Sequence, residues 1–443
     1  MSLIRYLPVD KFWCDLLAQF SLGFGSKSLS LEINSTNILG VLHPKLTPPH
    51  SSPENIVSKA LENPIASESV ESLFQSRVKM VVVVPDKTRN SGAVVFLPML
   101  IDRLNRAGIQ DSDIKIILAA GSHVGHTPEQ KEKIVGKEMF QRIEVCDHDC
   151  RDDENLIYVG ETKFGTPVFI NRNLVEDRKV MVTGTAVHHY FAGFGGGPKM
   201  INPGCAGYET IRRNHALTID PQTGWLHARC RAGVMEGNPL QEDILDSRRF
   251  IRADFLFETV LDDRGEIVAA FAGDLIEAHQ QACNLVDGFY KVPIPEPADL
   301  VVVSCGGYPK DINFIQAHKS LHNAFYAVKK GGVILALAEC REGIGAETFL
   351  DWFNFTNDDE FRDSLKRYYQ LNGTTALALK MKTHAARLIL VSNLPGELVK
   401  KLGMTPASNL EEGWKLAQSM LPGNFCCYVI PNGSLTLPFL NEQ

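Results

Sequence analysis

The sequence has no apolar run of membrane-spanning length, no excess of basic residues and no dense group of cysteines. A transmembrane helix needs about 20 consecutive apolar residues, and charged residues interrupt the segment 1–20 where a signal peptide would be apolar. The formal net charge of -7 excludes the basic surface that nucleic-acid binding requires. The ten cysteines are scattered over 443 residues, which is typical of reduced thiols. We therefore expect a cytoplasmic protein without a membrane or nucleic-acid partner.

A complete set of zinc ligands is also missing. The run Cys146-Asp147-His148-Asp149-Cys150 brings two thiols and an imidazole close together in the sequence. A structural zinc site needs a further ligand pair at a comparable spacing, and the chain has none. We interpret this run as the end of a strand over 143–146 and its turn, where Asp and His side chains bond to the loop backbone.

Length and patterning predict an α/β protein with more than one domain. The chain is too long for a single hydrophobic core, and its 44% hydrophobic and 22% charged residues are ordinary globular values. From residue 78 onward, short apolar runs alternate with helical patterns, which indicates βαβ units. We expect two α/β domains built from parallel βαβ units, with the active site in the cleft between them.

A proline-rich break at 293–297 marks the predicted domain boundary. We expect an N-terminal α/β domain over 1–290, which binds the cofactor and carries the catalytic residues and is completed by 395–443. A C-terminal α/β domain over 291–394 is expected to close the site.

The individual elements follow from the apolar patterns and the turn residues. Strands are predicted over 78–84, 114–119, 180–182, 300–304, 333–338 and 386–391. Helices are predicted over 55–61, 93–107, 209–217, 276–290, 314–329 and 410–420, with another that begins at Pro128 behind the N-cap Thr127. Two short strands over 31–34 and 38–42 are expected to form a hairpin.

Polar residues repeatedly follow the predicted strands. Ligands of open parallel sheets bind at the carboxyl ends of the strands. Side chains that follow different strands can therefore converge on one crevice, and we expect this of Asp86, Arg89, His123, His189 and Lys199.

The densest group of informative residues runs from His188 to His215. It holds two adjacent histidines, a cluster of glycines and Lys199. Glycine lets the backbone approach a ligand closely and adopt positive φ, which favours a cofactor loop. The alternative, a flexible linker, would be rich in Ser rather than in Phe, Tyr and His. Lys199 itself has three alternative interpretations: a phosphate contact, a covalent anchor or a solvated lysine.

The residue types in this region favour acid–base chemistry on a small anion. His123 and His189 lie on strand-end loops, and imidazole is the usual proton-transfer group near neutral pH, although a loop histidine can also be structural. Arg89 and Lys319 can clamp a carboxylate or phosphate, and Gln316 lies one helical turn before Lys319. The residues alone leave the cofactor open.

Several motifs in the same order resemble those of the nickel-dependent lactate racemase family. The motifs are Asp86-Lys87-Thr88-Arg89, Gly121-Ser122-His123, His189 through Gly196-Gly197-Pro198-Lys199, Asn202-Pro203-Gly204, His215, and Gly306-Gly307-Tyr308-Pro309 followed by Gln316-Ala317-His318-Lys319. The resemblance extends from about Val78 to the C-terminal helix. It implies an isomerase that racemises or epimerises a small-molecule 2-hydroxy acid.

The resemblance also implies a cofactor, the nickel pincer nucleotide. This is a pyridinium-3,5-bisthiocarboxylic acid mononucleotide whose carbon and sulfur atoms hold nickel, and it depends on cofactor-synthesis proteins of the host. By the resemblance, Lys199 tethers the cofactor through a thioamide and His215 binds nickel. The remaining implied cofactor residues are Asp86, Thr88, Gly195, Gly196 and Gly197.

His123 and His189 are the implied catalytic pair, and Arg89, Gln316 and Lys319 are the implied substrate-binding residues. One histidine takes the hydroxyl proton while the α-hydride moves to the cofactor, which leaves a planar 2-keto acid. Return of hydride to the other face requires a histidine on the opposite side to restore the proton, so racemisation needs two bases.

Departures from the family pattern indicate a larger or more polar substrate than lactate. Asn90 and Val124 stand where the family commonly has Pro and Arg, and Ile315 stands where the lactate enzymes have Tyr. Pro198 precedes the implied tether where a small hydroxylated residue is usual.

Two alternative functions remain at this stage. A nicotinamide-dependent hydroxy-acid dehydrogenase would use similar His and Arg chemistry, but the sequence lacks a convincing Gly-x-Gly-x-x-Gly after a strand. The other alternative is a non-catalytic or apo homologue that keeps the fold without the cofactor.

Overall fold

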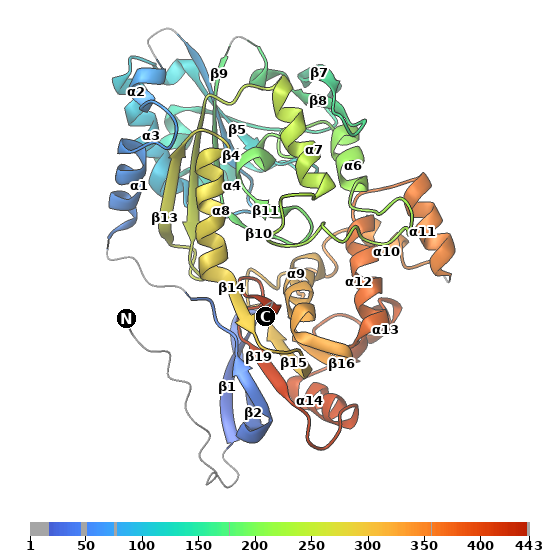
Figure 1. Ribbon diagram of the computed structural model, residues 1–443. Helices are drawn as coiled ribbons and strands as arrows, with labels where there is room; N and C mark the ends of the chain where they lie inside the picture. Colours follow the sequence, from blue (N-terminus) through green and yellow to red (C-terminus); the bar gives the residue numbers. More distant parts are fainter. Residues whose placement is uncertain (1–16, 46–50, 75–77, 177, 356, 441–443) are drawn as a thin grey trace. The chain divides into compact units, whose positions relative to one another are not determined.

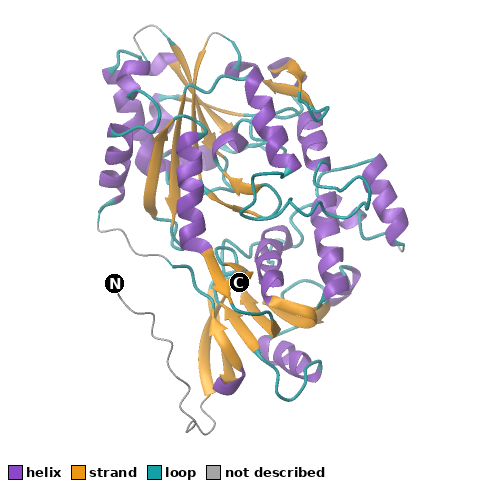
Figure 2. Cartoon of the chain, viewed as in Figure 1, coloured by secondary structure: helices purple, strands orange, loops and turns teal. Residues whose placement is uncertain are grey.

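The computed structural model describes residues 17–45, 51–74, 78–176, 178–355 and 357–440 (Figures 1 and 2). The chain divides into two compact units. Unit 1 comprises 1–43, 292–347 and 379–443, and unit 2 comprises 44–291 and 348–378. Each unit contains its own six-stranded sheet. The predicted α/β class with two domains is therefore confirmed, and no helix among the described residues is long and apolar enough to cross a membrane.

The sheet of unit 2 is parallel except for one edge strand. Its strand order is β13-β12-β9-β4-β5-β6, in which only β13 runs antiparallel to its neighbour. In this order the strands are Ile267–Gly273, Phe255–Leu261, Arg178–Thr185, Lys79–Pro85, Ile114–Ala119 and Glu144–Asp147. The predicted strands of the first domain are thus neighbours in one sheet.

The apolar sequence of β4 explains its central place. Met80, Val82 and Val84 pack on one face against α1 and α3, whereas Val81 and Val83 pack on the other face. All five side chains are fully buried. Successive side chains of a strand point to opposite faces, so a continuous apolar run requires cover on both sides.

Helices and two small hairpins complete unit 2. The helices are α1 (Pro53–Glu62), α2 (Val70–Leu73), α3 (Ala93–Arg106), α4 (Pro128–Val135), α5 (Lys137–Arg142), α6 (Tyr208–Ala216), α7 (Pro239–Ser247) and α8 (Glu277–Tyr290). As predicted, Thr127 caps α4, here in a capping box with Gln130. The hairpins pair β7 (Leu156–Glu161) with β8 (Pro167–Asn171) and β10 (Val187–His189) with β11 (Gly193–Gly195). The segment 348–378 of this unit holds α11 (Asp358–Arg367), most of α10 (Glu347–Asp351) and the first residues of α12 (Gly373–Ala385), which continues into unit 1.

The sheet of unit 1 is parallel throughout. Its order is β18-β17-β16-β15-β19-β3, and the strands are Thr405–Ala407, Arg387–Val391, Val328–Leu337, Ala298–Ser304, Cys427–Ile430 and Ile38–Val41. The other elements are the hairpin β1 (Leu17–Phe24) and β2 (Lys27–Asn34), the pair β14 (Lys291–Ile294) and β20 (Leu437–Leu440), and the helices α9 (Phe314–Ala324), α13 (Gly396–Lys401) and α14 (Leu410–Ser419). Apolar residues of β1, β2 and α14 cover one face of this sheet.

Three sequence expectations differ from the structure. The strands near 31–34 and 38–42 do not pair with each other, because β2 pairs with β1 and β3 pairs with β19. Residues 395–443 lie in unit 1 rather than completing the N-terminal domain, because their strands join the second sheet, and 348–378 lie in unit 2. Helix α9 ends at Ala324 instead of 329, since β16 already begins at Val328.

Candidate active site

Asp86 and His123 follow the neighbouring strands β4 and β5 and are hydrogen-bonded to each other. His123 Nδ1 lies 2.7 Å from Asp86 Oδ2, and Thr88 donates to Asp86 Oδ1 from its N–H at 3.2 Å and its hydroxyl at 2.7 Å. Burial alone would raise the pKa of this carboxyl, but the hydrogen bonds from His123 and Thr88 and the charge of Arg89 lower it. An ionised carboxylate only accepts, so His123 donates from Nδ1 and its Nε2 carries a lone pair when the ring is neutral.

Arg89 presents a guanidinium that no carboxylate neutralises among the described residues. Its only described side-chain hydrogen bond runs to Thr88 O at 3.4 Å, while its backbone N–H closes a turn on Asp86 O at 3.0 Å. The charge of Arg89 lowers the pKa values of Asp86 and Lys199, so all three groups lie within electrostatic range. Such a guanidinium can bind a substrate carboxylate.

A second histidine–carboxylate pair holds the loop that carries Asp86 and Arg89. His126 Nδ1 lies 2.6 Å from Asp147 Oδ1, and its Nε2 accepts from the Lys87 N–H at 3.2 Å. The His126 side chain is completely buried. Sequence reasoning missed this pair, because its members lie 21 positions apart and form no recognisable motif.

The cysteine–histidine run that contains Asp147 begins at the end of β6 and continues into the following turn, as predicted. Cys146 Sγ donates to Glu144 at 3.2 Å, and the buried His148 bonds through Nε2 to Ala206 O at 2.9 Å. In the described part of the chain, no three His, Cys, Asp or Glu side chains are grouped as a metal site would require.

The glycine cluster runs from β11 (Gly193–Gly195) through Gly196 into a 3₁₀ turn over Gly197–Met200. Gly196 and Gly197 adopt positive φ, 86° and 45°. A Cβ atom on Gly196 would collide with the Glu258 carboxylate, and one on Gly197 would collide with the His279 ring. The close approach that glycine permits here is to protein side chains; contact of Gly195, Gly196 and Gly197 with a cofactor stays a prediction.

The two adjacent histidines have different surroundings. His188 Nε2 bonds to Asp287 Oδ1 at 2.7 Å, its side chain is 7% exposed and burial lowers its pKa, so it is structural. His189 Nδ1 accepts from the Ala192 N–H at 3.2 Å. A neutral His189 ring therefore carries its proton on Nε2, the opposite of His123.

Lys199 lies in the 3₁₀ turn with its side chain partly buried. The structure gives its amine no hydrogen bond or ion pair within the described residues. Burial, together with the charge of Arg89, lowers the pKa of Lys199 from 10.5 to about 7. A substantial fraction of the amine is then neutral at physiological pH, and a neutral amine is nucleophilic.

His215 lies on α6 with its ring orientation fixed by the helix. Its Nδ1 donates to Ile211 O at 2.9 Å, which leaves the lone pair on Nε2. Burial and the charge of Lys199 lower its pKa to about 3. The Phe191 ring lies 4.5 Å from the His189 ring and 5.6 Å from the His215 ring, centroid to centroid. A neutral imidazole whose other nitrogen bonds to a backbone carbonyl is the usual form of a metal-binding histidine.

Gln316 and Lys319 lie on α9 of unit 1. Asn313 caps this helix by accepting from the Gln316 N–H at 3.0 Å, and Lys319 Nζ donates to Gln316 Oε1 at 2.6 Å. The predicted placement of both side chains on one helical face is correct. Their relation to the candidate residues of unit 2 stays a prediction.

Two threonines at the start of α12 contact Tyr190 and Thr218 and were not predicted. Tyr190 Oη and Thr375 Oγ1 lie 2.7 Å apart, as do Thr218 Oγ1 and Thr374 Oγ1. Tyr369 Oη bonds to the same Thr374 hydroxyl at 2.7 Å. The Thr375 hydroxyl therefore holds the side chain of Tyr190, the residue next to His189.

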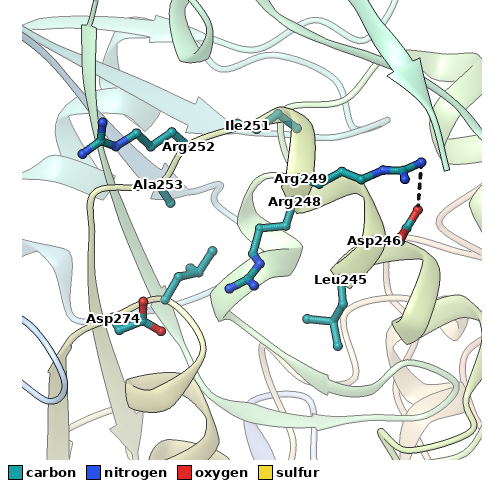
Figure 3. A pocket seen from close by; sticks show the side chains of 9 residues that line it. Leu245, Asp246, Arg248, Arg249, Ile251, Arg252, Ala253 and Asp274 are labelled. Atoms are coloured by element: carbon teal, nitrogen blue, oxygen red, sulfur yellow. Dashed lines mark ion pairs between the residues drawn. The ribbon is translucent and has the colours of Figure 1, made fainter.

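A pocket of about 320 Å³ lies elsewhere on unit 2 (Figure 3). It is lined by Leu245, Asp246, Arg248, Arg249, Ile251, Arg252, Ala253, Asp274 and Leu275. None of the candidate residues lines it. Of its arginines, Arg249 pairs with Asp246 and Arg252 pairs with Asp254.

Known proteins match this chain over most of its length. Residues 24–225 match the lactate racemase N-terminal domain and residues 294–437 match the lactate racemase C-terminal domain. The chain is 31% identical to lactate racemase from Thermoanaerobacterium thermosaccharolyticum over 94% of its length and 98% of the relative. It is 29% identical to lactate racemase from Lactiplantibacillus plantarum over 94% of its length and 99% of the relative.

Solved structures agree with these matches. The lactate racemase apoprotein of T. thermosaccharolyticum is similar with a TM-score of 0.87, covering 96% of this chain and 100% of that one at 31% identity. A Thermotoga maritima protein has the same fold at 19% identity and a TM-score of 0.63, covering 88% and 97% of the two chains. The chain belongs to the lactate racemase family of isomerases.

Proposed function

We propose that this protein racemises or epimerises a 2-hydroxy acid, with His123 and His189 as the acid–base pair. The observation that carries the proposal is the opposite proton placement on the two rings. His123 donates from Nδ1 to Asp86, and His189 accepts at Nδ1 from Ala192. In the neutral state the His123 Nε2 is a base and the His189 Nε2–H can donate a hydrogen bond, so the two rings present complementary groups to a substrate oxygen.

His123 acts as the base in the first half of the reaction. Its Nε2 takes the hydroxyl proton of the substrate, and the resulting imidazolium is stabilised by the ionised Asp86. His189, in its protonated form, gives a proton from Nε2 to the carbonyl oxygen that forms and becomes neutral. In the reverse direction the two rings exchange roles, because racemisation is symmetric.

Arg89 binds the substrate carboxylate in this proposal. Its guanidinium has no carboxylate partner in the described residues, and its charge lowers the pKa values of Asp86 and Lys199. Gln316 and Lys319, which bond to each other on α9, stay predicted substrate-binding residues. Lactate is the first substrate to test, because the relatives carry its name; larger and more polar 2-hydroxy acids follow, since Ile315 and Asn90 depart from the family pattern.

Lys199 and His215 fit a tethered, nickel-containing cofactor. The Lys199 amine is partly neutral near pH 7, as formation of a thioamide requires, and the His215 lone pair lies on Nε2, as nickel binding requires. The nickel pincer nucleotide, when bound, supplies the acceptor for the α-hydride. Asp86 and Thr88, which are bonded to each other, hold the neighbouring loop. A host with the cofactor-synthesis proteins is therefore needed.

Mass spectrometry and a chiral assay on protein from a cofactor-competent host test the proposal. The expected results are a mass addition mapped to Lys199, bound nickel, and interconversion of the enantiomers of at least one 2-hydroxy acid. The His123→Ala variant should keep the mass addition and nickel but lose the activity. An unmodified protein without nickel, inert toward a panel of chiral 2-hydroxy acids, would refute the proposal. A nicotinamide-dependent change in absorbance with the same acids would instead indicate the dehydrogenase alternative.

A further inference from the structure

A buried carboxylate–imidazole pair lies beneath the turn that carries Lys199. Glu258 on β12 is fully buried, and His279 on α8 is 3% exposed. Helix α8, yellow in Figure 1, packs on β12 and β13. Glu258 Oε2 lies 2.7 Å from His279 Nδ1, and Oε1 accepts from the Gly197 N–H at 2.8 Å. Both carboxylate oxygens are therefore engaged.

A buried carboxyl group is costly unless its oxygens are bonded, so its presence here needs a reason. The proposed acid–base chemistry does not use it. A nucleophile triad is excluded as well: Cys283 Sγ lies 3.4 Å from His279 Nε2, but this thiol is 1% exposed and burial raises its pKa. What the pair does contact is the backbone of the Lys199 turn.

The turn has no room to move toward the pair. The positions that Cβ atoms of Gly196 and Gly197 would take are filled by Glu258 and His279. The turn continues through a hydrogen bond from the Lys199 N–H to Gly196 O at 3.0 Å. Lys199 therefore sits two residues from an anchored peptide group, while its side chain has no described hydrogen bond of its own.

We propose that Glu258, oriented by His279, is a positioning residue that fixes the Gly197–Met200 turn and thereby the direction in which Lys199 presents its amine. This role goes beyond the racemase function, because it concerns the amine before any ligand reaches it. The positioning role of Glu258 is the same for any electrophilic group that reacts with the Lys199 amine.

Trace acetylation of the full-length, cofactor-free protein tests the proposal. Acetic anhydride is applied over a range of pH, and peptide mass spectrometry compares labelling of Lys199 with that of the exposed Lys133. In the wild-type protein the labelling of Lys199 should rise around pH 7. In Glu258→Gln and His279→Ala the midpoint should move upward by at least about one pH unit, with about five-fold less labelling at pH 7.

Two variants separate positioning from general loss of stability. His279→Asn keeps a side-chain N–H that can donate to Glu258, and it should restore most of the wild-type pH profile. Thr259→Ala removes a buried hydroxyl on the same strand, which donates to Ser91 O at 2.8 Å, and should leave the profile unchanged. A folded His279→Ala variant with a wild-type profile would overturn the proposal, as would an equal shift in Thr259→Ala.

Amide hydrogen exchange in the wild-type protein gives a measurement that needs no variant. The Gly197 N–H, bonded to a buried carboxylate, should exchange slowly, at a rate comparable to that of β12. Fast exchange of Gly197 would overturn the proposal even if every variant failed to fold.

Discussion

Replacing Lys199 by methionine should stabilise the cofactor-free protein, and more so at low pH than at high pH. Methionine has a similar length but no charge, so the substitution removes the free-energy cost of burying an ammonium group. The pKa of Lys199 falls from 10.5 to about 7 on folding. Each unit of such a shift corresponds to about 1.4 kcal/mol, which sets a ceiling of roughly 5 kcal/mol. Because the side chain is only partly buried, we expect about 1–3 kcal/mol.

The sign of the pH dependence follows from which state binds the proton. Below pH 7 the amine is charged in both states, and the folded protein bears the full cost. Between pH 7 and 10.5 the unfolded chain keeps the proton that the folded state has lost, so the stability of the wild-type protein rises with pH. The advantage of Lys199→Met should therefore shrink toward pH 10.5.

Urea denaturation followed by circular dichroism measures the effect. At about pH 6 the Lys199→Met variant should show its full advantage, and at about pH 9.5 roughly a third of it. Lys133→Met, at an exposed position, serves as the matched control and should change stability little at either pH. Equal effects of Lys199→Met at the two pH values would refute the reasoning, since they would mean that folding leaves the pKa of the Lys199 amine unchanged.

Three further substitutions test the electrostatics of the site. Asp86→Asn removes the anion that holds His123 Nδ1–H, so the racemisation rate of the loaded enzyme should fall by about 10²–10⁴ with nickel retained, as measured by chiral chromatography and metal analysis. His215→Ala should lose nickel, measured as metal per chain, because it removes the neutral imidazole whose Nε2 carries the lone pair. Arg89→Met should raise KM for the acid and raise the pKa of Lys199, since the Arg89 charge now lowers it; trace acetylation that shows an unmoved Lys199 profile would contradict this coupling.

The residues that could be predicted are those for which a local pattern coincides with a strand end. The apolar run of β4 required burial on both faces, so Asp86, which follows it, had to lie at the carboxyl edge of the sheet. His123 follows the adjacent strand in the same way, and the two side chains meet. The predicted roles of Asp86 and His123 came from the family motifs, whereas their predicted position at one edge of the sheet came from the strand ends.

The supporting residues could not be predicted, because their contacts join distant parts of the chain. Glu258 and Gly197 are 61 positions apart, and Thr375 and Tyr190 are 185 apart. Nothing near Glu258 in the sequence distinguishes it from an exposed strand residue. The glycines of the cluster were conspicuous, yet the partners that make them necessary became evident only in the folded chain.

The pairing of β3 with β19 has a consequence for biosynthesis. Strand β3 ends at Val41, and its partner begins at Cys427, so almost the whole polypeptide must leave the ribosome before this edge of the sheet can form. Contacts of such large sequence separation fold slowly. Most of the strands of unit 2 are synthesised earlier and can fold first. The nascent chain consequently carries β3 without its partner strand through most of translation.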